Sequence, residues 1–144
     1  MLTRRVLPML ILASTMAAAV IAGAPVASAA DPSDTVVVNC LGKQVTEPKQ
    51  IVVTCGDASV MVMRIDWSSW TANGAKGTGT LTWNTCLPKT CVAGIVETYK
   101  VRVTLGRVAS APSSPAFTRM TLAFPDGGPA AAETATYTLD NKAR

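Results

Sequence analysis

The chain has 144 residues, with 13 Lys and Arg against 9 Asp and Glu, a formal net charge of +4 and 49% hydrophobic residues. This length predicts a single domain with room for a short appended segment. The sequence contains no histidine, which excludes Ser-His-Asp and Cys-His nucleophile pairs, His-ligated catalytic zinc and a histidine general base.

Residues 1–30 have the three parts of an export signal. A basic start at Arg4-Arg5 precedes an uncharged apolar stretch of 16 residues, and a small-residue cleavage motif follows. The stretch is slightly short for a membrane-spanning helix, whereas its flanks match those of a signal peptide. We therefore expect cleavage after Ala29 or Ala30, and a secreted, extracellular domain of residues 31–144 without a stable membrane anchor.

Loss of the leader changes the charge of the chain. The exported part keeps 11 basic residues against 9 acidic residues, a net charge near +2. Its basic residues are spread along the sequence without a run or a stripe. We therefore predict no nucleic-acid partner and no basic amphipathic helix that binds a membrane surface.

The exported part has the pattern of about seven short strands separated by turn residues, at the spacing of a sandwich or barrel. The predicted strands are Val36–Cys40, Gln50–Cys55, Val60–Trp67, Gly77–Trp83, Val96–Leu105, Phe117–Phe124 and Ala135–Leu139. Turn clusters such as Asn73-Gly74 separate them. No segment after residue 31 has helical periodicity, and Ala130–Glu133 is expected to be a loop.

Alternation of apolar and polar residues predicts which side chains face the core in three of these strands. The predicted inward residues are Met61, Met63, Ile65 and Trp67, then Tyr99, Val101, Val103 and Leu105, and then Met120, Leu122 and Phe124. The expected fold is therefore all-β, a small antiparallel β-sandwich for which an immunoglobulin-like arrangement is one version. About 114 residues can bury a modest core of this kind.

All four cysteines lie in the exported part. An even number in a small secreted domain predicts two disulfides, for which three pairings exist. We expect Cys40–Cys55 and Cys86–Cys91, because each pair encloses a loop-rich segment. A zinc site of four thiolates is disfavoured, since the cysteines do not form two close pairs. The lack of Cys-x-x-Cys also disfavours a redox-active pair. We predict no metal and no cofactor.

Three tryptophans are the most distinctive side chains. Trp67 and Trp83 fall in phase with apolar strand residues, which places them in the core. Trp70 follows the end of a predicted strand and has polar neighbours. It is therefore the candidate for an exposed ring that stacks on a sugar.

Lys89, in the middle of the Cys86–Cys91 loop, is the second candidate binding residue. A disulfide-closed loop of this size would hold the lysine in one conformation and lower the ordering cost of binding. Inhibitors of trypsin-like proteases present a basic residue on such loops. A stapled hairpin connection with a solvated lysine is the alternative.

Asp57, Asp66 and Glu97 are the carboxylates considered for acid–base chemistry. Each has a structural explanation as a turn residue or as a solvated charge near basic neighbours. No motif pairs two of them as a glycosidase requires. A carboxylate-dependent cell-wall hydrolase is therefore the less favoured hypothesis, and we expect no enzymatic activity.

Several short motifs follow one another in the middle of the chain. They are Cys55-Gly56-Asp57, Trp67-Ser68-Ser69-Trp70, Ala75-Lys76-Gly77-Thr78-Gly79-Thr80 and Asn84-Thr85-Cys86. In these motifs the chain resembles a family of small, uncharacterised secreted proteins of high-GC Gram-positive bacteria. The resemblance covers about half of the exported part. It implies export and a shared fold, and it brings no activity.

These observations together favour an exported, non-catalytic binding or structural domain. Its partner would be another protein or a component of the cell envelope, such as a glycan. A proteinase inhibitor that presents Lys89 is the alternative from a different class, and the carboxylate-dependent hydrolase is the third.

Overall fold

The computed structural model describes residues 35–87, 90–110 and 114–139. In this part the chain is all-β, as predicted, and every predicted strand segment contains a strand. One short strand, Gln44–Val45, was not predicted. The strands are β1 (Val37–Val38), β2 (Gln44–Val45), β3 (Gln50–Val52), β4 (Val60–Thr71), β5 (Gly74–Asn84), β6 (Val96–Ala109), β7 (Ala116–Ala123) and β8 (Thr134–Thr138). Single 3-10 turns, η2 (Cys91–Ala93) and η3 (Pro129–Ala131), lie in the connections.

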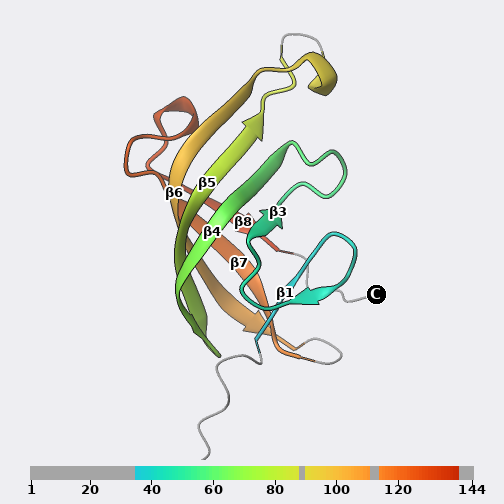
Figure 1. Cartoon of the computed structure of the whole chain (residues 1–144), viewed down its shortest axis with the longest axis vertical. Coiled ribbons are helices and arrows are strands. Elements are labelled where there is room, and N and C mark those ends of the chain that lie inside the picture. The colour runs from blue at the N-terminus through green and yellow to red at the C-terminus, as the bar shows by residue number, and fades with distance from the viewer. Residues whose placement is uncertain (1–34, 88–89, 111–113, 140–144) are drawn as a thin grey trace, which may run out of the picture.

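Six of these strands form one antiparallel sheet in the order β3-β4-β5-β6-β7-β8. Figure 1 shows the long strands β4, β5 and β6 side by side and the sheet curling, so that β7 and β8 lie behind β4. The result is a half-barrel with β3 and β8 as its two edge strands. A separate hairpin, β1-β2, is joined to β7 through a parallel bridge between Val36 and Ala116.

The predicted two-sheet sandwich, including its immunoglobulin-like version, differs from this arrangement. A Greek-key sandwich needs connections that cross between two facing sheets, whereas each strand from β3 to β8 pairs with its neighbours in the sequence. Bulges bend strands and increase their twist, and they occur in β4. The apolar face is therefore buried mainly by curling of a single sheet around it.

Because of the bulges in β4, the residues of this strand that face the core differ from those predicted. Between Met63 and Asp66 the register with β5 shifts, and Arg64 has a left-handed φ of 51°. Val62 is buried in consequence, whereas Met63 and its alternate neighbour Met61 are only half-buried. The prediction that these two methionines face the core is wrong, because one extra residue reverses the alternation.

The predicted core positions of β6 and β7 are confirmed. The fully or almost fully buried residues of these strands and the position after β7 are Val101, Val103, Leu105, Phe117, Met120, Leu122 and Phe124. Tyr99 is half-buried and packs against this core. Alternation is regular from Tyr99 to Leu105 and from Met120 to Phe124, so the period of two predicts these inner faces correctly. Phe117 is three positions before Met120 and lies outside the predicted pattern.

Both predicted disulfides are confirmed. Cys40 pairs with Cys55 at a Cα–Cα distance of 5.3 Å, Cys86 pairs with Cys91, and no cysteine is free. Two disulfides point to an oxidising, extracellular environment. The predicted leader, residues 1–30, lies outside the described residues. Among the residues that are described, no helix is long and apolar enough to cross a membrane.

Candidate functional site

A cavity lies at the open seam of the half-barrel, between the hairpin and the two edge strands. Its volume is about 450 Å³. We call it the seam cavity. Its lining residues are Val37, Val38, Asn39, Val45, Pro48, Lys49, Gln50, Ile51, Val52, Val53, Cys55, Thr138 and Leu139. They come from β1, β2, β3 and the adjoining loops and from the end of β8, so that Val37 and Leu139 at the extremes are about 100 residues apart in the sequence.

The seam cavity has an apolar interior and polar groups among its exposed lining residues. Val37, Ile51 and Leu139 are buried and belong to the main core cluster. Lys49 and Gln50 are exposed. An apolar cavity with a few polar groups at its margin, in the open side of a β-barrel, is a common form of a small-ligand site.

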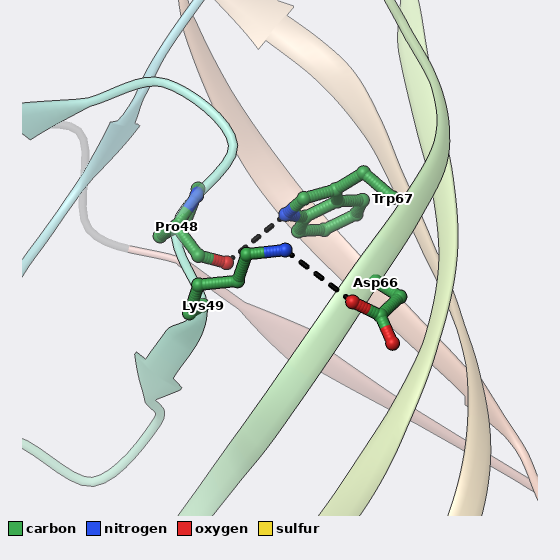
Figure 2. A network of polar contacts seen from close by, with 4 residues as sticks. All are labelled: Pro48, Lys49, Asp66 and Trp67. Atoms are coloured by element: carbon green, nitrogen blue, oxygen red, sulfur yellow. Dashed lines mark hydrogen bonds and ion pairs between the residues drawn. The ribbon is translucent and has the colours of Figure 1, made fainter.

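Trp67 anchors the cavity wall formed by Pro48 and the residues that follow it to the sheet. Figure 2 shows its ring lying between β4 and the segment that precedes β3. Its Nε1 donates a hydrogen bond of 3.0 Å to the carbonyl oxygen of Pro48, and Lys49 Nζ lies 3.3 Å from Asp66 Oδ1. These contacts hold the chain that leads into β3 close to β4, so the cavity wall has a fixed position.

Trp70 anchors the start of the N-terminal arm, the segment that runs from Thr35 through the β1-β2 hairpin. It is only 8% exposed, and its Nε1 donates a hydrogen bond of 2.9 Å to the carbonyl oxygen of Thr35. The expectation of an exposed ring at Trp70 that stacks on a sugar is therefore wrong. A second register shift, between Trp67 and Ser69, turns Trp70 to the inner side of the sheet.

The two tryptophans also pack on each other. Their ring centroids lie 4.8 Å apart at an interplanar angle of 84°, and Trp70 meets Phe117 edge-on at 5.3 Å. Such edge-to-face pairs stabilise beyond simple burial. The Trp-x-x-Trp motif thus binds two backbone carbonyls, that of Thr35 before β1 and that of Pro48 before β3. The sequence alone shows the motif but not the bulge that aligns its rings. Trp83 was predicted to lie in the core. It is half-buried and lines a small cavity beside the core residue Phe124.

The three candidate carboxylates are each engaged locally. Asp66 pairs with Lys49 on the outer side of β4, while Glu97 accepts a hydrogen bond from the hydroxyl of Tyr99 on the inner side of β6. Asp66 and Glu97 therefore lie on opposite faces of the sheet. Asp57 lies in the turn before β4 and accepts the Ser59 backbone N–H at 3.0 Å.

Hydrogen bonds from Ser59, first from its backbone and then from its side chain, hold the pKa of Asp57 below its ordinary value of 3.8. Its carboxylate also lies within 4.8 Å of the sulfurs of Cys86 and Cys91. A metal-binding cysteine acts as a thiolate, and both sulfurs are in a disulfide. This cluster therefore has one available ligand, the carboxylate of Asp57.

The β5–β6 connection projects from the end of the molecule away from the β4–β5 turn (Figure 1). Its disulfide is supported by Asn84, whose Oδ1 accepts the Cys86 backbone N–H and whose Nδ2 donates to the Cys91 carbonyl oxygen. Lys89 lies outside the described residues. Around it, the connection and the first residue of β6 expose four apolar side chains, Leu87, Val92, Ile95 and Val96.

No family model, curated protein or solved structure matches this chain. The structural roles described above therefore rest on the geometry of the chain itself.

Proposed function

We propose that the chain is an exported, non-catalytic binding domain and that it holds a small apolar ligand in the seam cavity. The carrying observation is an apolar cavity of about 450 Å³ between the two edges of a curled sheet. This volume falls within the range of about 300–1,000 Å³ typical of small-molecule sites. Lys49 and Gln50 lie at the exposed margin of the cavity, where their side chains contact Asp66 and Met61, so the apolar part of a ligand is what the cavity should select.

Two features support a pre-formed site. The Cys40–Cys55 disulfide joins the hairpin region to the chain after β3, and Cys55 itself lines the cavity. The Trp67 and Trp70 hydrogen bonds hold Pro48, just before β3, and Thr35, just before β1, to the sheet. A site that is ordered before binding loses less conformational entropy when the ligand enters.

A titration with a fluorescent fatty-acid analogue tests this proposal. The purified protein should enhance the probe's fluorescence to saturation. Val45→Phe adds volume to a half-buried cavity residue and should weaken binding by about tenfold or more, equivalent to about 1.4 kcal/mol.

Val96→Phe is the matched control, because Val96 is 56% exposed at the start of β6 and does not line the seam cavity. It should leave probe binding unchanged, and melting curves should show both variants folded. Absence of saturable binding, or an equal effect of the two substitutions, would overturn the proposal.

A proteinase inhibitor remains the second candidate. It is supported by the disulfide across the Cys86–Cys91 loop and by the hydrogen bonds of Asn84 that hold its two ends together. The protein at nanomolar concentration should then slow trypsin, and Lys89→Ala should abolish the effect. Uninhibited trypsin at micromolar protein would eliminate this candidate.

A further inference from the structure

Basic side chains that are scattered in the sequence gather on the outer face of the sheet. Lys76 in β5 and Lys100 and Arg102 in β6 are exposed, and each lies between residues that are buried or, for Tyr99, half-buried. Because residues alternate across a strand, all three point away from the core. The register places Thr80 opposite Lys100 and Thr78 opposite Arg102.

Two arginines extend this group to the neighbouring strands. Arg64 in β4 reaches the same face, since its Nη2 donates to the Thr80 hydroxyl at 3.2 Å. Arg119 in β7 is exposed opposite Gly106 of β6. We name the five residues together the basic face: Arg64, Lys76, Lys100, Arg102 and Arg119.

The positive charge of the basic face is largely unneutralised. Asp66 is the carboxylate on this side of β4, and it is already paired with Lys49. Among the described residues no other ion pair occurs within 4.0 Å. Four other carboxylates, Glu47, Asp57, Asp126 and Glu133, lie in turns and bends. In the described part of the chain, the five cations of the basic face therefore outnumber the one carboxylate of the sheet beside them, Asp66.

The basic face carries hydroxyl groups but no aromatic ring. Thr78, Thr80 and Thr104 lie between its cations on β5 and β6, and hydroxyls donate hydrogen bonds to anionic oxygens. All seven aromatic residues of the chain lie in the core, pack against it or line the small cavity at its end. Single-stranded nucleic acids are usually held by stacking of bases on aromatic rings, which this face does not offer.

We propose that the basic face binds a linear, base-free polyanion of the cell envelope, whose repeated charges are phosphodiester or carboxylate groups. Adjacent strands lie about 4.8 Å apart and alternate residues of one strand about 6.7 Å apart. The cations therefore form a lattice that an extended polymer can follow. The inference rests on the proposed export, but it uses a surface separate from the seam cavity.

Binding to polyphosphate, to poly-glutamate and to single-stranded DNA of equal charge, measured over a salt series, tests this inference. Wild-type protein should bind polyphosphate or poly-glutamate, with log K falling linearly with log salt. Lys100→Ala/Arg102→Ala should weaken that binding by about tenfold and make the salt slope shallower by about one to two. The polymer that binds more tightly identifies the phosphate or the carboxylate class.

Lys43→Glu is the matched control, because it changes the net charge by the same amount on an exposed residue of the β1–β2 turn. It should retain polyanion binding, and the double variant should still bind the fatty-acid probe, so that failure here is distinct from failure of the seam cavity. An equal loss in both variants would show a net-charge effect only and would overturn the inference. DNA binding tenfold tighter than polyphosphate would overturn it as well.

Discussion

At the scale of single residues, the two indole N–H groups of the Trp-x-x-Trp motif have different surroundings. Trp70 donates to a carbonyl of Thr35, a residue that is only 1% exposed. Trp67 donates to Pro48 in a partly buried position. Loss of a partner is costly only where water cannot replace it, so the Trp70 contact should matter more.

We predict that Trp70→Phe lowers the free energy of unfolding by about 2 kcal/mol or more, because it leaves a buried carbonyl without a donor. Trp67→Phe should cost about 1 kcal/mol, since water can reach the Pro48 carbonyl. Urea unfolding followed by circular dichroism measures both. Equal losses would contradict the difference in burial.

The two tyrosines of the chain provide a second prediction at this scale. The hydrogen bond to Glu97 raises the pKa of Tyr99 above its ordinary value of 10.0, and burial raises the pKa of Tyr137. A raised tyrosine pKa favours folding below the unfolded value, and this contribution is lost as pH rises through the folded pKa. Stability should therefore decline above about pH 10.

Phenolate absorbance during an alkaline titration measures both tyrosines. The whole signal should have its midpoint above 10.0. Glu97→Ala removes the acceptor and should move the Tyr99 part of the signal toward 10.0. In the Tyr137→Phe variant, the whole titration signal comes from Tyr99, so the two contributions can be assigned. A titration with both tyrosines at the ordinary value would disprove these contacts.

At the scale of elements, the bulges of β4 depend on glycines in the facing strand β5. A Cβ added to Gly77 would lie 2.6 Å from the Asp66 carbonyl oxygen and 3.0 Å from Cε3 of Trp67. Gly106 in β6 has no atom within 4 Å of the same position. The close approach at Gly77 therefore explains this glycine in the motif that the sequence singled out.

We predict that Gly77→Ala destabilises the protein by about 1–3 kcal/mol, because backbone atoms must move to admit the methyl group. Gly106→Ala should remain within about 0.5 kcal/mol of the wild type. Thermal unfolding of the two variants compares them directly. A neutral Gly77→Ala would mean that β4 and β5 are less closely paired here than described.

Strand positions were largely predictable from the sequence, because alternation and turn residues depend on neighbours along the chain. The inner faces of β6 and β7 followed from this local pattern. The face of β4 did not, since one residue with left-handed φ at Arg64 reverses the alternation and leaves no mark in composition. The burial of Trp70 was missed because a second bulge, between Trp67 and Ser69, changes the alternation again.

At the scale of the whole molecule, long-range arrangement was the part that the sequence did not predict. The seam cavity combines residues near Val37 with Leu139, and the basic face combines four strands. Both depend on how the sheet curls, which local patterns do not encode. The disulfides were predictable because each closes a short loop.

We predict that the two disulfides contribute unequally to stability. In the chain-entropy model, closure of the 15-residue Cys40–Cys55 loop is worth about 3 kcal/mol and that of the shorter Cys86–Cys91 loop about 2 kcal/mol. Cys40→Ser/Cys55→Ser should therefore show the larger decrease in unfolding free energy. Guanidinium unfolding tests the order, and a larger loss for Cys86→Ser/Cys91→Ser would reverse it.

The parallel bridge between Val36 and Ala116 has a consequence for the order of folding. Neighbouring strands from β3 to β8 meet through short connections, whereas this bridge joins residues 80 positions apart. Closing long loops costs more entropy and slows contact formation. The meander can therefore form first, and the N-terminal arm docks last, when Val36 accepts the N–H of Phe117 and Thr35 meets Trp70. Since the Cys40–Cys55 disulfide closes a loop of only 15 positions, it can form before this docking and keep the arm close to β3 until the bridge is made.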